Sequence, residues 1–181
     1  MTFRPHHDPT HLYFATLTLH GWRHLLTEPS YASIILDSLD WLRQHDRWCL
    51  YAFVIMPSRL HIIVRPSDSL IISDVLQQFA SYTAHAILKE LRKEQRSELL
   101  AFFAEHADAG KQHGIWQEVQ AQNVYSVDFL RQKLEYIHNN AVVKRRALVD
   151  NRADYPYSSA CFYDRGVMPL IEVDDIGPWL C

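Results

Sequence analysis

A tyrosine and an asparagine in the C-terminal third of the chain have residue types and a spacing that could serve nucleophilic chemistry. Tyr136 and Asn140 stand four residues apart in a segment with helical periodicity, so their side chains share one helix face. At 100° per residue, Leu130, Leu134 and Ile137 form the opposite, core-facing stripe. A free phenol is a poor nucleophile unless a nearby charge activates it. Taken alone, Tyr136 is therefore an ordinary tyrosine of an amphipathic helix.

Basic side chains concentrate on and after this helix. Between residues 131 and 152, six Lys and Arg residues stand against two acidic ones, a local excess of four positive charges in a chain whose formal net charge is −3. Such an excess can dock phosphate groups, although the helix dipole alone also favours cations near a helix C-terminus. The candidate phosphate contacts in this region are Lys133, Lys144, Arg145 and Arg146.

The composition is that of one compact domain. We expect residues 1–181 to form a single unit with a loose N-terminus over 1–11, because 48% of the chain is hydrophobic and only 5 residues are glycine. No apolar run approaches the ~20 residues that span a bilayer, and the N-terminal residues lack a signal-peptide pattern. We therefore expect a cytoplasmic protein without a membrane partner. The three cysteines are too widely spaced to favour a disulfide framework or a zinc motif.

The elements that must position the polar residues alternate between strands and helices. Their order of strand, helix, strand, strand, helix, strand predicts an α+β, ferredoxin-like βαββαβ sandwich with an additional C-terminal helix that carries Tyr136. The segment 108–114 is expected to be a loop. The expected strands cover 13–19, 49–56, 60–66 and 115–120, and the expected helices cover 29–46, from Ser69 or Ser73 to 94, 97–107, and from Ser126 to 139 or 140.

Three segments resemble known transposases. The sequence YAFVIMPSRLHIIVRP (51–66) is similar to the strand-turn-strand signature of single-tyrosine HUH transposases, in which Met-Pro and a polar residue precede His-apolar-His. The sequence EYIHNNAVVKRRALVDNRADYPYSSACFYDRG (135–166) resembles the C-terminal half of their REP-associated tyrosine transposase branch. The sequence IWQEVQAQNV (115–124) resembles the Trp-Gln strand that precedes it. These matches extend over most of the chain in the same order as in that family.

The resemblance implies a protein that binds single-stranded or hairpin DNA, cleaves it and rejoins it. In such a reaction, paired imidazoles hold Mg²⁺ or Mn²⁺ and a tyrosine attacks the scissile phosphate, which gives a 5′-phosphotyrosine and a free 3′-hydroxyl. By the same resemblance, Tyr136 matches the nucleophile, His61 matches the second histidine and Asn140 matches the polar group that completes the metal site. The resemblance also implies a homodimer.

Arg59 stands where the first histidine of the pair belongs. A guanidinium is always charged, has no lone pair for a metal and repels a cation beside it, so a normal two-histidine metal site cannot form. Either Arg59 binds the DNA phosphate directly and replaces part of the charge of the ion, or the nuclease is inactive and the fold is kept for binding. Ala141, which replaces the usual proline, should alter only the helix end.

Three functions therefore remain open from the sequence. A nuclease would form a covalent adduct with DNA through Tyr136. A domesticated, non-catalytic DNA-binding or regulatory module would bind hairpins equally well after Tyr136→Phe or with a chelator present. A ferredoxin-like protein-interaction domain would show no salt-sensitive affinity for DNA.

Overall fold

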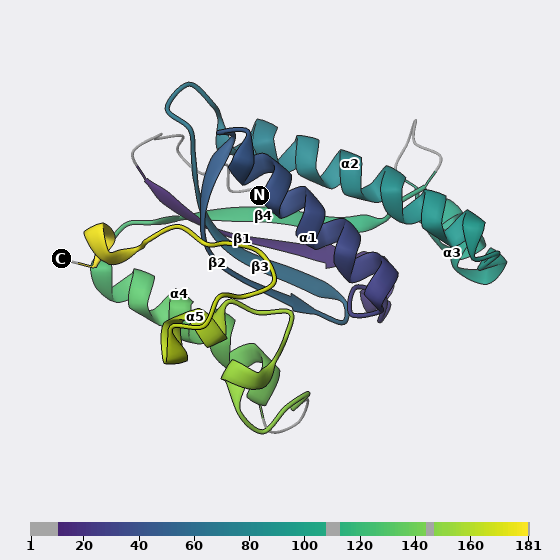
Figure 1. Cartoon of the computed structure of the whole chain (residues 1–181). Coiled ribbons are helices and arrows are strands. Elements are labelled where there is room, and N and C mark those ends of the chain that lie inside the picture. Colours follow the sequence, from purple (N-terminus) through teal and green to yellow (C-terminus); the bar gives the residue numbers. More distant parts are fainter. Residues whose placement is uncertain (1–10, 108–112, 144–146, 181) are drawn as a thin grey trace.

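A four-stranded antiparallel sheet lies at the centre of the molecule (Figure 1). The structure is a computed structural model that describes residues 11–107, 113–143 and 147–180. The strand order is β2-β3-β1-β4, which is the order of a ferredoxin-like sheet and confirms the predicted α+β fold class. The strands are β1 (Leu12–Leu19), β2 (Trp48–Met56), β3 (Arg59–Pro66) and β4 (Trp116–Val124).

Two long helices and one short helix belong to the layer on one face of the sheet (Figure 1). Alternate strand residues such as Leu17, Phe53 and Ile62 point to this face and are fully buried there. The apolar stripes of the helices cover them, so this side forms the larger core. The helices are α1 (Pro29–Gln44), α2 (Ile72–Lys93) and α3 (Ser97–Glu105).

The helix that carries Tyr136 lies against the opposite face, with a second and smaller core (Figure 1). This core contains the predicted stripe of Leu130, Leu134 and Ile137. The side chain of Ser126 accepts a hydrogen bond from the backbone N–H of Phe129 at 3.2 Å, which confirms the predicted N-cap. The helices of this layer are α4 (Val127–Asn139) and α5 (Ala160–Arg165). Short 3₁₀ turns cover His20–Trp22, Asn140–Val142, Arg152–Asp154 and Gly177–Trp179.

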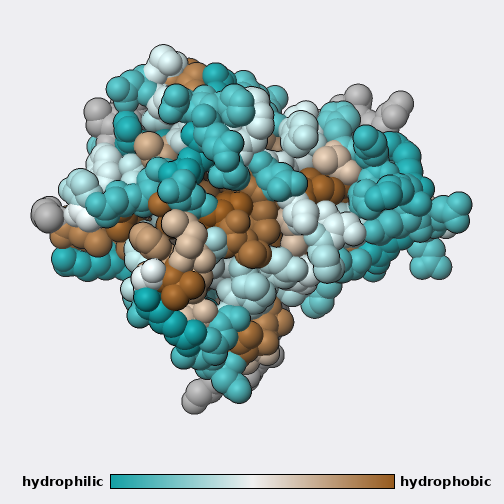
Figure 2. Space-filling view, viewed as in Figure 1, coloured by the Kyte–Doolittle hydropathy of each residue, from teal (hydrophilic) through white to brown (hydrophobic). Residues whose placement is uncertain are grey.

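The segment after α4 packs along the outer edge of β2. Backbone N–H groups of Ile55 and Leu50 donate to the Tyr157 carbonyl at 2.8 Å and to the Asp174 carboxylate at 2.7 Å. The Tyr155 hydroxyl donates to the Ile55 carbonyl at 2.7 Å. These bonds satisfy edge groups that could otherwise pair with another chain. Figure 2 shows apolar side chains gathered near the centre of this view, where the C-terminal segment crosses the sheet.

Some predicted boundaries need correction. Neither Ser69 nor Ser73 caps α2, because Ile71 occupies the N-cap position without a side-chain hydrogen bond. Strand β4 ends at Val124, four residues beyond the predicted end, because its whole length pairs with β1. Of the predicted loop, 108–112 lie outside the described residues. Within the described part of the chain, no helix is both long and apolar enough to cross a membrane.

Candidate nucleic-acid interface

Strand β3 brings Arg59 and His61 to the same face of the sheet. Arg59 pairs with Thr18 and His61 pairs with Thr16 of β1, so the two β3 side chains point toward the α4 layer. The intervening Leu60 belongs to the core on the other face. The two positions of the histidine motif are therefore adjacent on one surface, as the resemblance requires, with a guanidinium at the first.

His61 is buried and held by its neighbours, with an exposed fraction of 3%. Its Nδ1 lies 2.8 Å from the Thr16 hydroxyl oxygen, and its ring stacks on Phe14 at a centroid distance of 5.7 Å. Burial, and then the positive charges of Arg59 and Lys133, lower the pKa of His61 to about 4. His61 is therefore neutral near pH 7, and Nε2 is the ring nitrogen not engaged with Thr16.

Tyr136 lies directly against this histidine. The two rings meet edge to face with centroids 5.3 Å apart, and the Tyr136 ring makes a similar contact with Phe14 at 5.8 Å. The side chain is 46% exposed. The expectation that Tyr136 faces away from the core stripe needs correction, because Tyr136 lies on the flank of α4, where one side of its ring contacts the sheet and the other remains accessible.

Asn140 lies one turn after Tyr136, as its spacing predicts. Its amide nitrogen donates to the backbone carbonyl of Tyr136 at 2.7 Å, so the side chain caps the end of α4. This bond uses the amide nitrogen and orients the amide group. The amide oxygen, which is the atom that could bind a cation, takes no part in the bond. Asn140 therefore has a structural role as a helix cap, in addition to the metal-site role that the resemblance implies.

Lys133 extends along the same flank of α4. Its ammonium nitrogen lies 4.4 Å from the ring centroid of Phe14, 5.0 Å from that of Phe129 and 5.8 Å from that of Tyr136. Partial burial lowers the pKa of Lys133. The predicted phosphate contact thus lies beside Tyr136 and His61. The aromatic residues around Lys133 cannot be grouped from the sequence, because only the packing of α4 on β1 brings them together.

The other predicted cations divide into two groups. Lys144, Arg145 and Arg146 lie outside the described residues. Arg152, part of the local basic excess, donates to Glu135 at 2.7 Å and to Asp164 at 2.7 Å. These pairs raise the pKa of Arg152 and lower those of both carboxyls. Arg152 therefore ties α4 to α5 and does not add a free positive charge, which corrects the simple charge count.

His138 has a structural role that the sequence did not reveal. It is buried, and its Nε2 lies 3.0 Å from the Ser159 hydroxyl oxygen. The same Ser159 oxygen accepts the backbone N–H of Phe53 at 3.0 Å. Burial lowers the pKa of His138 to about 4, with a further contribution from Arg152. The Tyr-Pro-Tyr-Ser-Ser motif thus docks α4 on β2 and fixes the position of Tyr136.

The residues around Tyr136 do not fit an ion held by paired imidazoles. The site offers one imidazole, and Arg59 and Lys133 place two positive charges near it. In the ranges that the structure describes, no three His, Cys, Asp or Glu side chains are grouped so that they could hold a metal ion. A divalent cation would meet like charge and too few donors here.

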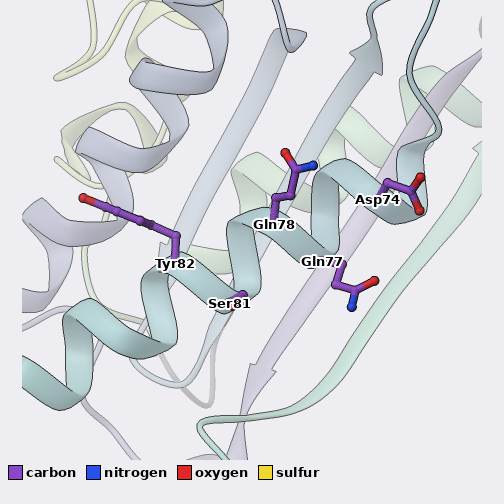
Figure 3. Close-up of a pocket in the computed structure, with 5 residues that line it drawn as sticks. All are labelled: Asp74, Gln77, Gln78, Ser81 and Tyr82. Atoms are coloured by element: carbon purple, nitrogen blue, oxygen red, sulfur yellow. The ribbon is translucent and has the colours of Figure 1, made fainter.

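The described cavity of about 630 Å³ lies on the other layer, along α2 (Figure 3). The lining residues come from successive turns of that helix: Asp74, Gln77, Gln78, Ser81 and Tyr82. It contains a carboxylate and no cation, which does not suit a phosphate. The face around Tyr136 is therefore the better candidate interface.

The sheet and its two helical layers define an α+β fold with a tyrosine beside a strand histidine. No family model and no curated protein matches the chain. Its fold is similar to that of a REP-associated tyrosine transposase solved bound to a REP hairpin, with a TM-score of 0.67, 18% identity and coverage of 97% of this chain and 93% of that one. A protein of Deinococcus radiodurans with a provisional transposase assignment aligns over 77% of this chain and 95% of its own, at 15% identity. Its TM-score of 0.42 is too low to bear on the fold.

Proposed function

We propose that this chain is a REP-associated tyrosine transposase relative that binds hairpin or single-stranded DNA, with strand cleavage weakened or lost. One observation carries the proposal: the fold matches that of a hairpin-bound transposase over 97% of this chain, and Tyr136, His61 and Arg59 gather on one face of it. The sequence motifs that resemble this family include β3, which carries Arg59 and His61, and the part of α4 that carries Tyr136, and they support assignment to this family.

The proposed contacts to DNA are electrostatic. The planar guanidinium of Arg59 can donate two parallel hydrogen bonds to a phosphate, and Lys133 adds a second positive charge on the same face. Lys144, Arg145 and Arg146 are proposed to hold the backbone further along the strand. A protein with a formal net charge of −3 needs such a local surface, because its overall charge repels DNA.

Cleavage by Tyr136 is the second candidate function, and the contact between Tyr136 and His61 favours it. In this reaction the phenolic oxygen forms a bond to phosphorus, the bond from phosphorus to the 3′-oxygen breaks, and the phenolic proton leaves while the 3′-oxygen gains one. Arg59 would stabilise the charge on the phosphate oxygens. Arg59 leaves one imidazole where paired imidazoles would hold a metal ion, which is why we propose that the chain keeps DNA binding while cleavage is weakened or lost.

The test is a search for a denaturation-resistant adduct between the protein and labelled strands that carry a hairpin, with Mn²⁺ or Mg²⁺ and with a chelator. Wild type, Tyr136→Phe and Arg59→His are compared. We expect DNA binding by all three proteins and an adduct only after Arg59→His. An adduct with wild type that Tyr136→Phe abolishes would instead establish an active nuclease. Absence of salt-sensitive DNA binding would favour the protein-interaction domain.

The homodimer that the resemblance implies is also a proposal. Light scattering of the purified chain with and without hairpin DNA measures it directly. A mass of twice the 21.2 kDa chain supports the dimer, and a mass of one chain at all concentrations contradicts it.

A further inference from the structure

An exposed tyrosine stands at the junction between β4 and α4. Tyr125 is 72% exposed, although its ring stacks on that of Phe129 with centroids 4.7 Å apart and planes within 14° of parallel. A stacked pair of this kind has one ring face against its partner and the other toward solvent. The solvent-facing side of Tyr125 is a flat, aromatic surface of the size of a nucleobase.

Direct contacts connect the Tyr125–Phe129 pair to the candidate interface around Tyr136. Phe129 contacts the ammonium of Lys133, which also lies over Phe14 and Tyr136, and Phe14 stacks on His61. Along α4, Phe129, Lys133 and Tyr136 follow one another at spacings of four and three residues and so share one flank. Tyr125 precedes the N-cap Ser126 and joins this row through its stack on Phe129. A strand that enters at Tyr125 would reach Lys133 and then Tyr136.

Tyr125 belongs to neither core, although its partner Phe129 packs against the smaller one. Leu130, Leu134 and Ile137 already fill the contact between α4 and the sheet, and each is at most 7% exposed. Other exposed aromatic residues, such as Tyr82 on α2, lie in the opposite layer. An exposed ring that stacks beside a cation suits a ligand with a flat face and a negative charge, which describes a nucleotide.

We propose that Tyr125 stacks on an unpaired nucleobase of the bound DNA. A base within a duplex already has neighbours on both faces, so only a base outside the stem can use the free face of Tyr125. The surface from Tyr125 to Tyr136 therefore recognises single-stranded DNA beside the hairpin, and the stem binds elsewhere. This inference rests on the proposed function, because it identifies which part of the DNA the same face binds.

The experiment compares two probes with the same stem. One is a DNA hairpin with short unpaired flanks, and the other is a blunt stem closed by a non-nucleotide linker, which has no unpaired base. Binding is measured for wild type, Tyr125→Ala, Tyr125→Phe and the exposed control Tyr82→Ala, whose side chain lies on α2 (Figure 3). A fluorescent adenine analogue in each flank reports stacking, and a thermal melt of each variant confirms folding.

Tyr125→Ala should weaken binding of the flanked hairpin by roughly five- to hundredfold and remove the quenching of the base analogue. Tyr125→Phe and Tyr82→Ala should bind as wild type does, and all four proteins should bind the blunt stem equally. If wild type and Tyr125→Ala bind the flanked hairpin with the same affinity, or if Tyr125→Ala weakens both probes alike, the stacking role is wrong and DNA binding stands. If wild type binds neither probe, the proposed function fails and this inference fails with it.

Discussion

The residues around Tyr136 show how burial and local charge set the chemistry of a site. His61 keeps a neutral ring beside Arg59 and Lys133 because protonation would add a third positive charge to a buried face. A phosphate on this face would supply negative charge and relieve the repulsion. The same arrangement that disfavours a divalent cation therefore favours an anionic ligand.

Burial of His61 and His138 should make folding stability depend on pH. The pKa of each is about 4 in the folded protein, against an ordinary value of 6.5. Below pH 6.5 the unfolded chain takes up protons that the folded protein does not, so stability is fully present above this pH and is lost progressively down to about pH 4. We expect a loss of about 3 kcal/mol for each histidine.

Urea unfolding at several pH values between about 7 and 4 measures this loss. His138→Gln should lower stability at neutral pH but reduce the fall between pH 6.5 and 4, because one of the two protonation sites is gone. A free energy of unfolding that stays constant over this range would contradict the assignment. The carboxyls of Glu135 and Asp164, whose pKa values Arg152 lowers, lose their contribution only in more acidic solution.

Replacement of Arg59 tests the proposed phosphate contact. Arg59→Ala should weaken hairpin binding by a similar factor for different stem sequences and lower the slope of log affinity against log salt concentration by about one. Arg92→Ala on the exposed end of α2 is the control, because that residue lies in the other layer. Titrations at several salt concentrations provide the slopes. Equal slopes for wild type and Arg59→Ala would show that Arg59 does not touch the backbone.

Single residues of the site differ in how far the sequence could predict them. The motif places Tyr136 and His61 in one site, and the helix spacing places Asn140 beside Tyr136. The stack of Tyr125 on Phe129 could not be predicted from helical spacing, because Tyr125 precedes the N-cap of α4 and its backbone is not helical. The role of Phe14 could not be predicted from the sequence, because Phe14 reaches Lys133 only through the pairing of β1 with β3 and the packing of α4 across both strands.

At the scale of elements, two helices begin for different reasons. A side-chain cap fixes the start of α4, and tertiary packing fixes the start of α2. The Ser126 hydroxyl caps α4, whereas Ser73 lies inside α2 and donates only to its neighbour Asp74 at 3.4 Å. The strands and helices themselves were predictable from periodicity. The start of α2 was not, because burial of Ile72 and Val75 against the sheet fixes it without a side-chain cap.

The two serines give a matched pair of substitutions. Ser126→Ala should lower the free energy of unfolding by about 1 kcal/mol, because the N–H of Phe129 loses its acceptor. Ser73→Ala should leave stability unchanged within about 0.5 kcal/mol, since its side chain is exposed. Chemical unfolding of the three proteins under one condition decides the point. A larger loss for Ser73→Ala than for Ser126→Ala would contradict these helix starts.

At the scale of the whole molecule, the C-terminal segment joins the two layers across the β2 edge. Ile171 and Val173 belong to the core under α1, and Ile176 belongs to the core under α4. Between them, the Asp174 carboxylate accepts the Leu50 N–H at 2.7 Å and pairs with Arg43 of α1 at 3.1 Å. No local pattern in the sequence predicts this path, because each contact joins residues more than 100 positions apart.

Removal of residues 167–181 should therefore destabilise the fold and expose the part of the β2 edge around Leu50, while the bonds from Tyr155 and Tyr157 to Ile55 remain. Three buried apolar side chains, Ile171, Val173 and Ile176, would be lost together with the hydrogen bonds to Leu50, so we expect several kcal/mol of destabilisation. The uncovered edge should also make the shortened protein associate as its concentration rises. Thermal melts and light scattering at two concentrations measure both effects.

Asp174→Asn is the milder comparison, because it weakens the pair with Arg43 while the apolar contacts remain. It should lower the melting temperature less than the truncation does. A truncated chain with the wild-type melting temperature and no association would show that the β2 edge is stable without this segment.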